Sequence, residues 1–247
     1  MTGQITQIIR HPIKSHGREA VAHVSLAAGQ TMPWDRTWAV AHELSDADGT
    51  EWMPCQHFSR GAKAPALAAI TAQLDENNAT VTLHHPTKGS LTFCPDTEGD
   101  AFLSWACGLI PANRAQSTKL VRAATRGFTD SDFPSVTLCN MASHRDVEAR
   151  IGRDLSIHRW RGNIWFDSLP AWSEFDWIGK EIQIGSAVVI PRERTGRCLA
   201  THSNPDTGDR DADILTALDS FGHRDFSIRA EVVHSGDIAL GDAIRCL

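Results

Sequence analysis

The sequence lacks several features that would place the chain in a familiar class. Its six cysteines lie far apart and form no Cys-x-x-Cys pair, which argues against structural zinc and against a cysteine-ligated iron–sulfur cluster. No apolar run approaches the length of a membrane span, and the residues after Met1 show no charged-then-apolar signal pattern. We therefore expect a cytoplasmic protein without a membrane segment, in which disulfides are disfavoured.

An excess of positive charge is missing as well. The formal net charge is -6, and a general nucleic-acid-binding protein would need a basic surface to displace phosphate counterions. An anionic small ligand would have to be held by local cations. Hydrophobic residues make up 41% and charged residues 22%, which is ordinary for a folded globular protein, and 247 residues suffice for two small domains with a core each.

Short alternating segments dominate the chain and predict a mixed, mainly β fold. Residues 5–9 and 34–42 alternate as strands should. In the second half, short strands with glycine turns and only two helices favour closure into a barrel, because a barrel leaves no exposed strand edge. With a boundary near Pro111–Arg114, we expect residues 1–113 to form a strand-rich α+β domain. Residues 114–247 would form a β-barrel domain with a few helices.

One cysteine stands in an unusual setting. Cys198 follows an arginine and precedes a polar, turn-forming segment, on a loop expected to leave a strand. Arg194 and Arg197 beside it favour a thiolate, the form that binds soft metals or acts as a nucleophile. On this segment alone, an ordinary buried or surface cysteine remains the alternative.

Cations and hydroxyls near the start of the chain suit an anionic ligand. Lys14 and Ser15 lie on a loop that follows the first expected strand, and Arg36 stands where the third expected strand begins. Solvated surface positions are the alternative for the first two. For Arg36 the alternatives are an ion pair with Asp35 or a solvated strand edge.

Two further places in the second half carry similar groups. Ser143 falls in the first turn of an expected helix, where a hydroxyl and backbone N–H groups make an anion site, with helix capping as a compatible alternative. Residues 155–166 alternate like a strand and would place Arg161 and Asn163 on one face, suited to a phosphate or a heterocycle. A strand-edge salt bridge is the alternative for Arg161.

Several of these segments resemble the MOSC family, the molybdenum cofactor sulfurase C-terminal domains. The signature Arg-Cys-x-x-Thr-x-x-x-Pro-Asp-Thr-Gly covers residues 197–208, and Gly-x-Ile-x-x-Gly-Asp closes the chain at residues 236–242. Pro-Ile-Lys-Ser followed by Asp-Arg-x-Trp resembles the N-terminal domain that accompanies MOSC domains in the mitochondrial amidoxime-reducing component and its bacterial relatives. The chain departs from the familiar Arg-Pro-Asn-Ile form at Gly162, where proline is usual.

The resemblance implies a molybdenum cofactor, Mo-molybdopterin, with Cys198 as the molybdenum ligand of the protein. Asp206 or His202 would supply protons, although Asp206 in its Pro-Asp-Thr-Gly segment is equally suited to turn formation. The groups implied to hold the pterin and its phosphate are Lys14, Ser15, Arg36, Ser143, Arg161, Asn163 and Arg197.

Three functions follow from these residues. The resemblance implies an oxidoreductase that reduces small N-hydroxylated compounds (amidoximes, hydroxylamines, N-hydroxylated bases) to amines or amidines, with electrons from an external flavin, haem or iron–sulfur reductase. A carrier of the cofactor, or of a persulfide on Cys198, would use the same cysteine without turnover. A cysteine hydrolase using His202 or His223 is the third reading, but no hydrolase signature surrounds Cys198.

Overall fold

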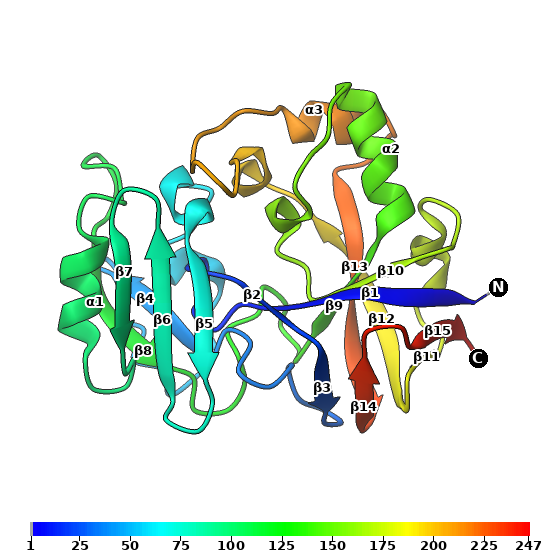
Figure 1. Cartoon of the computed structure of the whole chain (residues 1–247), viewed down its shortest axis with the longest axis horizontal. Coiled ribbons are helices and arrows are strands. Elements are labelled where there is room, and N and C mark those ends of the chain that lie inside the picture. Colours follow the sequence, from blue (N-terminus) through cyan, green and yellow to red (C-terminus); the bar gives the residue numbers. More distant parts are fainter. Residues whose placement is uncertain (1) are drawn as a thin grey trace.

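A closed seven-stranded barrel dominates the structure, a computed structural model that describes residues 2–247. The two chain ends lie together on its outer side (Figure 1). The first and last strands of the barrel order pair with each other, which closes it. The strands follow the order β10 (Ile164–Asp167), β9 (Val136–Asn140), β13 (Asp225–His234), β12 (Ala187–Gly196), β11 (Ile182–Ile184), β15 (Ala243–Cys246) and β1 (Gly3–Arg10). The predicted mainly β class with a barrel is confirmed.

Strand β1 enters the barrel from the N-terminal part of the chain. It pairs antiparallel with β10 and β15, and its outer end pairs with β2 (Glu19–Val21). Ile5 and Ile8 point inward and join a buried cluster with residues such as Ile164 and Ile228, so apolar burial fixes the register of β1.

A smaller β structure lies beside the barrel (Figure 1). It contains the pair β4 (Trp38–His42) and β8 (Ser117–Arg122) and the meander β5 (Thr71–Asp75), β6 (Thr80–His85) and β7 (Gly89–Phe93), with helix α1 (Gly99–Ala106). A second buried cluster around Trp38, Leu83 and Phe102 holds these elements together. Strand β1 from the first half of the chain pairs with β10 from the second half, and β4 pairs with β8, so strand pairings join the two sides of residues 113/114. The expected domain boundary there stays a prediction.

Helices α2 (Met141–Ile151) and α3 (Ile214–Asp219) cover one side of the barrel (Figure 1). Asn140 caps α2 by accepting a hydrogen bond from the Ala142 N–H, and α2 ends at Gly152 in the left-handed conformation. A further strand pair joins β3 (His23–Leu26) to β14 (Gly236–Ala239). Short 3-10 helices are η1 (Cys55–His57), η2 (Pro65–Ala69), η3 (Ile157–Trp160), η4 (Ser173–Trp177) and η5 (Leu199–His202). In the described part of the chain, no helix is long and apolar enough to cross a membrane.

The predicted strand over residues 155–166 is wrong in its first part. Ser156 accepts a hydrogen bond from the His158 N–H and starts η3, and Trp160 then stacks on Phe226 with ring centroids 3.8 Å apart. Arg161 adopts the left-handed conformation with φ 50°, and β10 begins only at Ile164. Capping and aromatic stacking therefore outweigh the alternating pattern, and Arg161 and Asn163 do not share one strand face.

Candidate functional site

A cavity of about 400 Å³ is lined by segments from both halves of the chain. Residues 14–68 contribute one part of its wall, and residues 129–229 contribute the other. The volume falls within the range of small-ligand sites, which commonly lie between packed units. Of the residues predicted to bind a ligand, it brings together Lys14, Ser15, Arg36, Arg161, Arg197 and Cys198.

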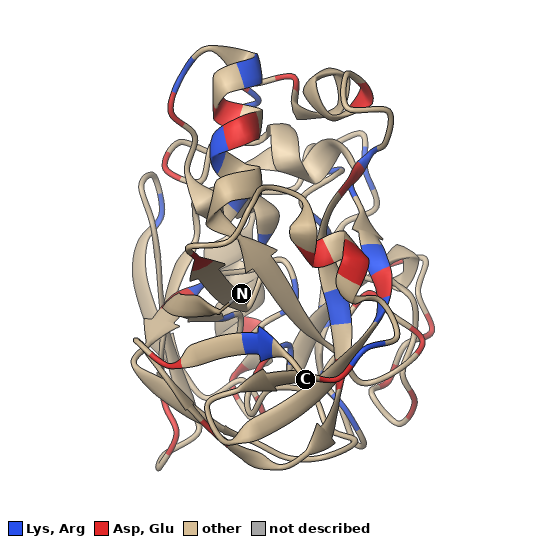
Figure 2. Ribbon diagram, turned by 90° about the vertical axis from the view of Figure 1, so that its right-hand side faces the viewer, with Lys and Arg blue, Asp and Glu red and all other residues tan. Residues whose placement is uncertain are grey.

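The cavity wall is strongly cationic, although the chain as a whole carries a net charge of -6. Asp130 is the one carboxylate side chain of the described residues in this wall. On the side of the molecule that carries the two termini, basic and acidic residues are interspersed (Figure 2). Positive charge is therefore concentrated at the cavity, as an anionic ligand requires. The cations are Lys14, Arg36, Arg60, Lys63, Arg159, Arg161, Arg197 and Arg229.

Half of these cations already have a carboxylate partner. The pairs are Lys14 with Asp130, Arg36 with Asp35, Arg159 with Asp211, and Arg229 with Glu193. Within residues 2–247, no carboxylate pairs with the other four, which are Arg60, Lys63, Arg161 and Arg197.

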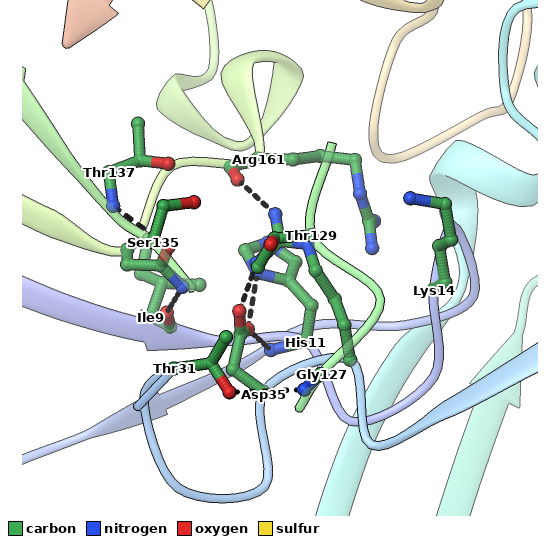
Figure 3. Close-up of polar contacts among 12 residues, drawn as sticks. Ile9, His11, Lys14, Thr31, Asp35, Gly127, Thr129, Ser135, Thr137 and Arg161 are labelled. Carbon is green, nitrogen blue, oxygen red and sulfur yellow. Dashed lines mark hydrogen bonds and ion pairs between the residues drawn. The ribbon is translucent and has the colours of Figure 1, made fainter. Parts of the chain in front are cut away.

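Lys14 approaches the cavity from the loop after β1. Its ammonium donates to the Phe128 carbonyl at 2.7 Å and pairs with Asp130. Burial lowers the pKa of Lys14, and Asp130 opposes that shift. Burial would raise the pKa of Asp130, but Lys14 and Arg36 lower it to about 2. The Lys14 and Arg161 side chains point toward each other across the same space (Figure 3).

Arg36 ties the two halves of the cavity together. Its guanidinium pairs with the buried carboxylate of Asp35 and donates to the Arg161 carbonyl at 2.8 Å. Asp35 also accepts the His11 backbone N–H at 2.8 Å (Figure 3). Burial alone would raise the pKa of Asp35, but Arg36 and His11 hold it well below its ordinary value. The ion pair expected as an alternative for Arg36 exists, and the same side chain lines the cavity.

Arg161 is one of the cavity cations without a carboxylate partner among the described residues. Its guanidinium donates to the Gly17 carbonyl at 3.3 Å, and burial together with repulsion from Arg36 lowers its pKa to about 9. The side chain is still protonated at neutral pH, so two neighbouring positive charges face one cavity. A bound anion would relieve this repulsion.

Arg197 and Cys198 follow the end of β12. Arg197 donates to the Trp160 carbonyl at 2.8 Å, to the Phe226 carbonyl and to the Ser227 hydroxyl, and burial lowers its pKa to about 10. The Cys198 carbonyl accepts from the N–H and the hydroxyl of Thr201 at 3.1 and 3.0 Å. The backbone of Cys198 is thereby fixed, while its side chain lies exposed at the cavity.

The structure does not bring Ser143 and Asn163 to the cavity. The fully buried Ser143 hydroxyl donates to Glu174 and accepts from the Trp172 N–H, both at 2.7 Å. The Asn163 amide donates to the Ile9 carbonyl and accepts from the Thr137 N–H, both at 3.2 Å. Both side chains join neighbouring strands and helices of the barrel.

The groups considered for proton transfer also lie away from the cavity wall. The side chain of Asp206 is 78% exposed, and its N–H donates to Asn204 Oδ1 at 2.8 Å, which forms an Asx turn. His202 accepts the Leu215 N–H, and His223 packs against aromatic rings that include Trp172. Neither histidine lines the cavity that contains Cys198.

The loop after Cys198 is fastened to the other half of the chain. Buried Arg18 donates to the carbonyls of Ala68 and Ile70 at 2.9 and 3.1 Å, and to that of Pro205 at 3.1 Å. Gly208, with φ 81°, packs so closely on Ala66 that a Cβ added to Gly208 would lie 2.7 Å from the Ala66 Cα. Arg18 therefore fixes the segment that carries Cys198.

Several cavity residues were not found from the sequence. Most of them stand outside the motifs, although Ser203 lies at an unspecified position of the 197–208 signature and Thr195 lies two residues before that signature. Arg159 has one local signal, a cation two residues before Arg161. Four cavity residues also hold a buried polar atom without a hydrogen-bond partner among the described residues, namely His158, Arg159, Thr195 and Ser203. The cavity residues missed are Cys55, Arg60, Lys63, His158, Arg159, Thr195, Ser203 and Arg229.

Family comparison agrees with this arrangement. The model of the MOSC N-terminal beta barrel domain matches residues 2–131, and that of the MOSC domain matches residues 126–245. The chain belongs to the MOSC family. MOSC domains are associated with molybdenum cofactor binding and sulfurase-like activity, so this MOSC protein is related to the molybdenum cofactor.

Solved structures give distant likenesses to the MOSC protein. The crystal structure of the YUAD protein from Bacillus subtilis is 11% identical and has a TM-score of 0.48, with 99% of this chain and 94% of that chain covered. YiiM from Geobacillus stearothermophilus is 21% identical over 45% of this chain and 53% of that chain, with a TM-score of 0.35. No curated protein matches the chain.

The donor set of the cavity fits a molybdenum cofactor. A pterin phosphate needs cations that no carboxylate neutralises, and Arg161 and Arg197 provide them, although both also donate to backbone carbonyls. Cys198 offers the soft sulfur ligand that molybdenum favours, and its side chain is free and exposed. The buried, unpartnered hydroxyls of Thr195 and Ser203 add hydrogen-bonding capacity on the same side as Cys198.

Proposed function

We propose that this MOSC protein is a molybdenum-cofactor-dependent reductase of N-hydroxylated compounds. One observation carries the proposal. An exposed cysteine stands in a cavity lined by eight cations and one carboxylate, in a chain that is otherwise acidic. The family resemblance of residues 12–15, 35–38 and 197–208 supports the same reading.

Residues from both halves would hold the cofactor. Arg161 and Arg197 would bind its anionic part directly, since neither has a carboxylate partner among the described residues. Lys14 and Arg36 would add charge and keep Asp130 and Asp35 ionised. Cys198 would be the molybdenum ligand, on a backbone that Thr201 fixes.

The proposed reaction converts an N-hydroxyl compound, two electrons and two protons into an amine or amidine and water. The bound cofactor supplies the two-electron chemistry that breaks the N–O bond. An external reductase would deliver the electrons. Asp206, expected as a proton donor, lies 3.8 Å from the Arg18 guanidinium, and we assign it to holding the Cys198 loop.

A carrier of the cofactor or of a persulfide is the second candidate. The exposure of the Cys198 side chain favours it, because transfer to another protein needs an accessible sulfur. The two candidates predict different behaviour of the loaded protein. A reductase turns substrate over while its cofactor stays bound, whereas a carrier exchanges it.

The test is an assay on freshly purified protein whose molybdenum content has been measured. A chemically reduced viologen would serve as the electron donor and 6-N-hydroxylaminopurine as the substrate. Turnover with retained molybdenum supports the reductase. Bound molybdenum that exchanges readily without turnover supports the cofactor carrier. The absence of molybdenum even after reconstitution would refute both the reductase and the cofactor carrier, and would leave only the persulfide carrier.

A further inference from the structure

A cationic turn stands directly beside the Cys198 loop. The backbone of Arg60 accepts hydrogen bonds from the N–H groups of Lys63 and Ala64 at 3.0 and 3.1 Å, which closes the turn. A Cβ added at Gly61 would lie 3.6 Å from the Cβ of Ala200, which is van der Waals contact. The turn therefore touches the residues that immediately follow Cys198.

The same turn is fixed to that loop by a hydrogen bond. The Arg210 guanidinium donates to the Ala62 carbonyl at 2.8 Å. On its other side the turn is anchored by Phe58, Ser59 and Ala64, which are all buried. Arg60 and Lys63 are thus held at the cavity by the backbone, although their side chains remain accessible.

Neither cation of this turn is neutralised. Arg60 donates to the Cys55 sulfur at 3.1 Å, and within residues 2–247 no carboxylate pairs with Arg60 or with Lys63. The remaining cavity cations either have a carboxylate partner or are assigned above to the cofactor. The turn therefore carries two positive charges that are neither paired with a carboxylate nor assigned to the cofactor.

We propose that Arg60 and Lys63 bind an anionic group of the substrate, and that the substrates are N-hydroxylated compounds carrying a phosphate. The inference rests on the proposed function, because a substrate that must reach a metal on Cys198 passes the turn beside Cys198. An arginine fork with a neighbouring ammonium suits a phosphate monoester. An N-hydroxylated base in its nucleoside monophosphate form combines both groups.

The first experiment compares three substrates on the cofactor-loaded protein. They are 6-N-hydroxylaminopurine, its riboside and its riboside 5′-monophosphate. We expect kcat/KM to be at least about tenfold higher for the monophosphate than for the riboside, the effect of one charge-assisted contact. In R60A/K63A this preference is expected to disappear. Arg114→Ala is the matched control, because Arg114 borders a neighbouring smaller cavity with Arg60 and Lys63 but does not line the main one.

The second experiment measures binding without turnover. Adenosine 5′-monophosphate and adenosine are titrated calorimetrically into the loaded protein and into R60A/K63A, after molybdenum analysis has shown equal cofactor content. Tighter binding of the monophosphate that is lost in the variant supports the inference. Equal affinity for the two compounds overturns it.

The two experiments separate the inference from the proposed function. If base, riboside and monophosphate are reduced equally well, the reductase stands and the phosphate site is wrong. If none is reduced, the proposed function fails, and the titration alone decides whether Arg60 and Lys63 bind phosphate. A monophosphate preference that survives in R60A/K63A also contradicts the inference.

Discussion

The sulfur of Cys139 occupies the space beside Gly162 that a side chain there would need. An ideal Cβ on Gly162 would lie 2.1 Å from the Cys139 Sγ, far inside contact distance. Cys139 is fully buried in β9, and burial raises the pKa of its thiol to about 12. Glycine is therefore the residue that fits at this position next to Arg161, whereas a proline, which carries a Cβ, would collide with the Cys139 sulfur.

This pairing predicts a rescue. Gly162→Ala should lower the free energy of unfolding by about 1–3 kcal/mol through overpacking. In Gly162→Ala/Cys139→Ala the loss should be smaller than the sum of the single losses, since the colliding sulfur is gone. Denaturant unfolding of the four proteins measures this coupling. Gly99→Ala is the control, because its Cβ would meet only an ordinary contact at 3.6 Å, and additive losses at 162 and 139 would contradict the prediction.

Cys198→Ser should abolish reductase activity and lower molybdenum retention while leaving the unfolding temperature nearly unchanged. An exposed thiol contributes little packing, whereas a serine hydroxyl is a poor ligand for a soft metal. Elemental analysis and the viologen assay check both effects. Cys246→Ser, at another exposed cysteine in β15, should retain molybdenum and activity. Full activity of Cys198→Ser would remove the basis of the mechanism.

Arg161→Gln should raise the stability of the cofactor-free protein and weaken its binding of the cofactor. Without cofactor, the variant should melt at a higher temperature, because a buried, repelled charge has been removed. In the variant, the free energy of cofactor binding should be weaker by about 1.5–3 kcal/mol, the value of one charge-assisted contact, so less cofactor should be retained. Thermal unfolding and molybdenum content measure the two effects.

A surface arginine provides the control for this comparison. Arg145 is exposed and pairs with Asp167, so Arg145→Gln should change neither quantity by much. Arg36→Ala tests cofactor binding less cleanly, because it also leaves the buried Asp35 carboxylate without its cation. Equal molybdenum content in Arg161→Gln and the unsubstituted protein would show that Arg161 does not bind the cofactor.

Arg18→Ala should loosen the loop that carries Cys198. The substitution leaves three carbonyls without their donor, at a cost of roughly 3 kcal/mol. Hydrogen exchange of residues 199–211 should become faster than in the unsubstituted protein. Arg224→Ala, which removes only an exposed pair with Asp219, should leave the exchange of this loop unchanged. Unaltered protection in Arg18→Ala would show that other contacts fix the loop.

The buried His16 should make the protein sensitive to mild acid. Burial lowers its pKa to about 4, so between pH 6.5 and 4 the unfolded chain binds a proton that the folded protein does not. The unfolding free energy should therefore decrease as the pH falls through this window, by about 3 kcal/mol for this group. His16→Gln should flatten the pH dependence measured by denaturant unfolding, and His84→Gln, at an exposed position, should not. Parallel curves for His16→Gln and the unsubstituted protein would contradict the prediction.

Local sequence patterns predicted those site residues that lie next to a recognisable strand. Lys14, Arg36 and Cys198 each follow or begin a strand, and their neighbours in the sequence mark them. The Arg60–Lys63 turn could not be placed in this way. Residues 45–65, which carry it, are rich in turn-forming residues without a strand or helix pattern, and its position depends on contacts with Ala200 and Arg210. Arg161 reached the cavity for a different reason than expected, through a left-handed residue after η3 instead of a strand face.

The barrel itself shows the same limit of local patterns. The alternation in β1 predicts a strand but not its neighbours, and apolar burial against residues far along the chain decides them. Ser143 lies at the start of a helix, as expected. Its hydroxyl is bound to Glu174, a buried partner that no spacing in the sequence indicates.

The position of β1 also bears on how the chain reaches its native state. Gly3 in β1 pairs with Ile244 in β15, so the barrel cannot close until β15, more than 230 residues further along the chain, has been synthesised. Until then, β1 can pair with β10 and β2, but the barrel edge that β15 fills stays open, and exposed apolar residues at such an edge are what chaperones recognise. A truncated chain that lacks β15 would therefore have an open barrel edge and a strong tendency to aggregate.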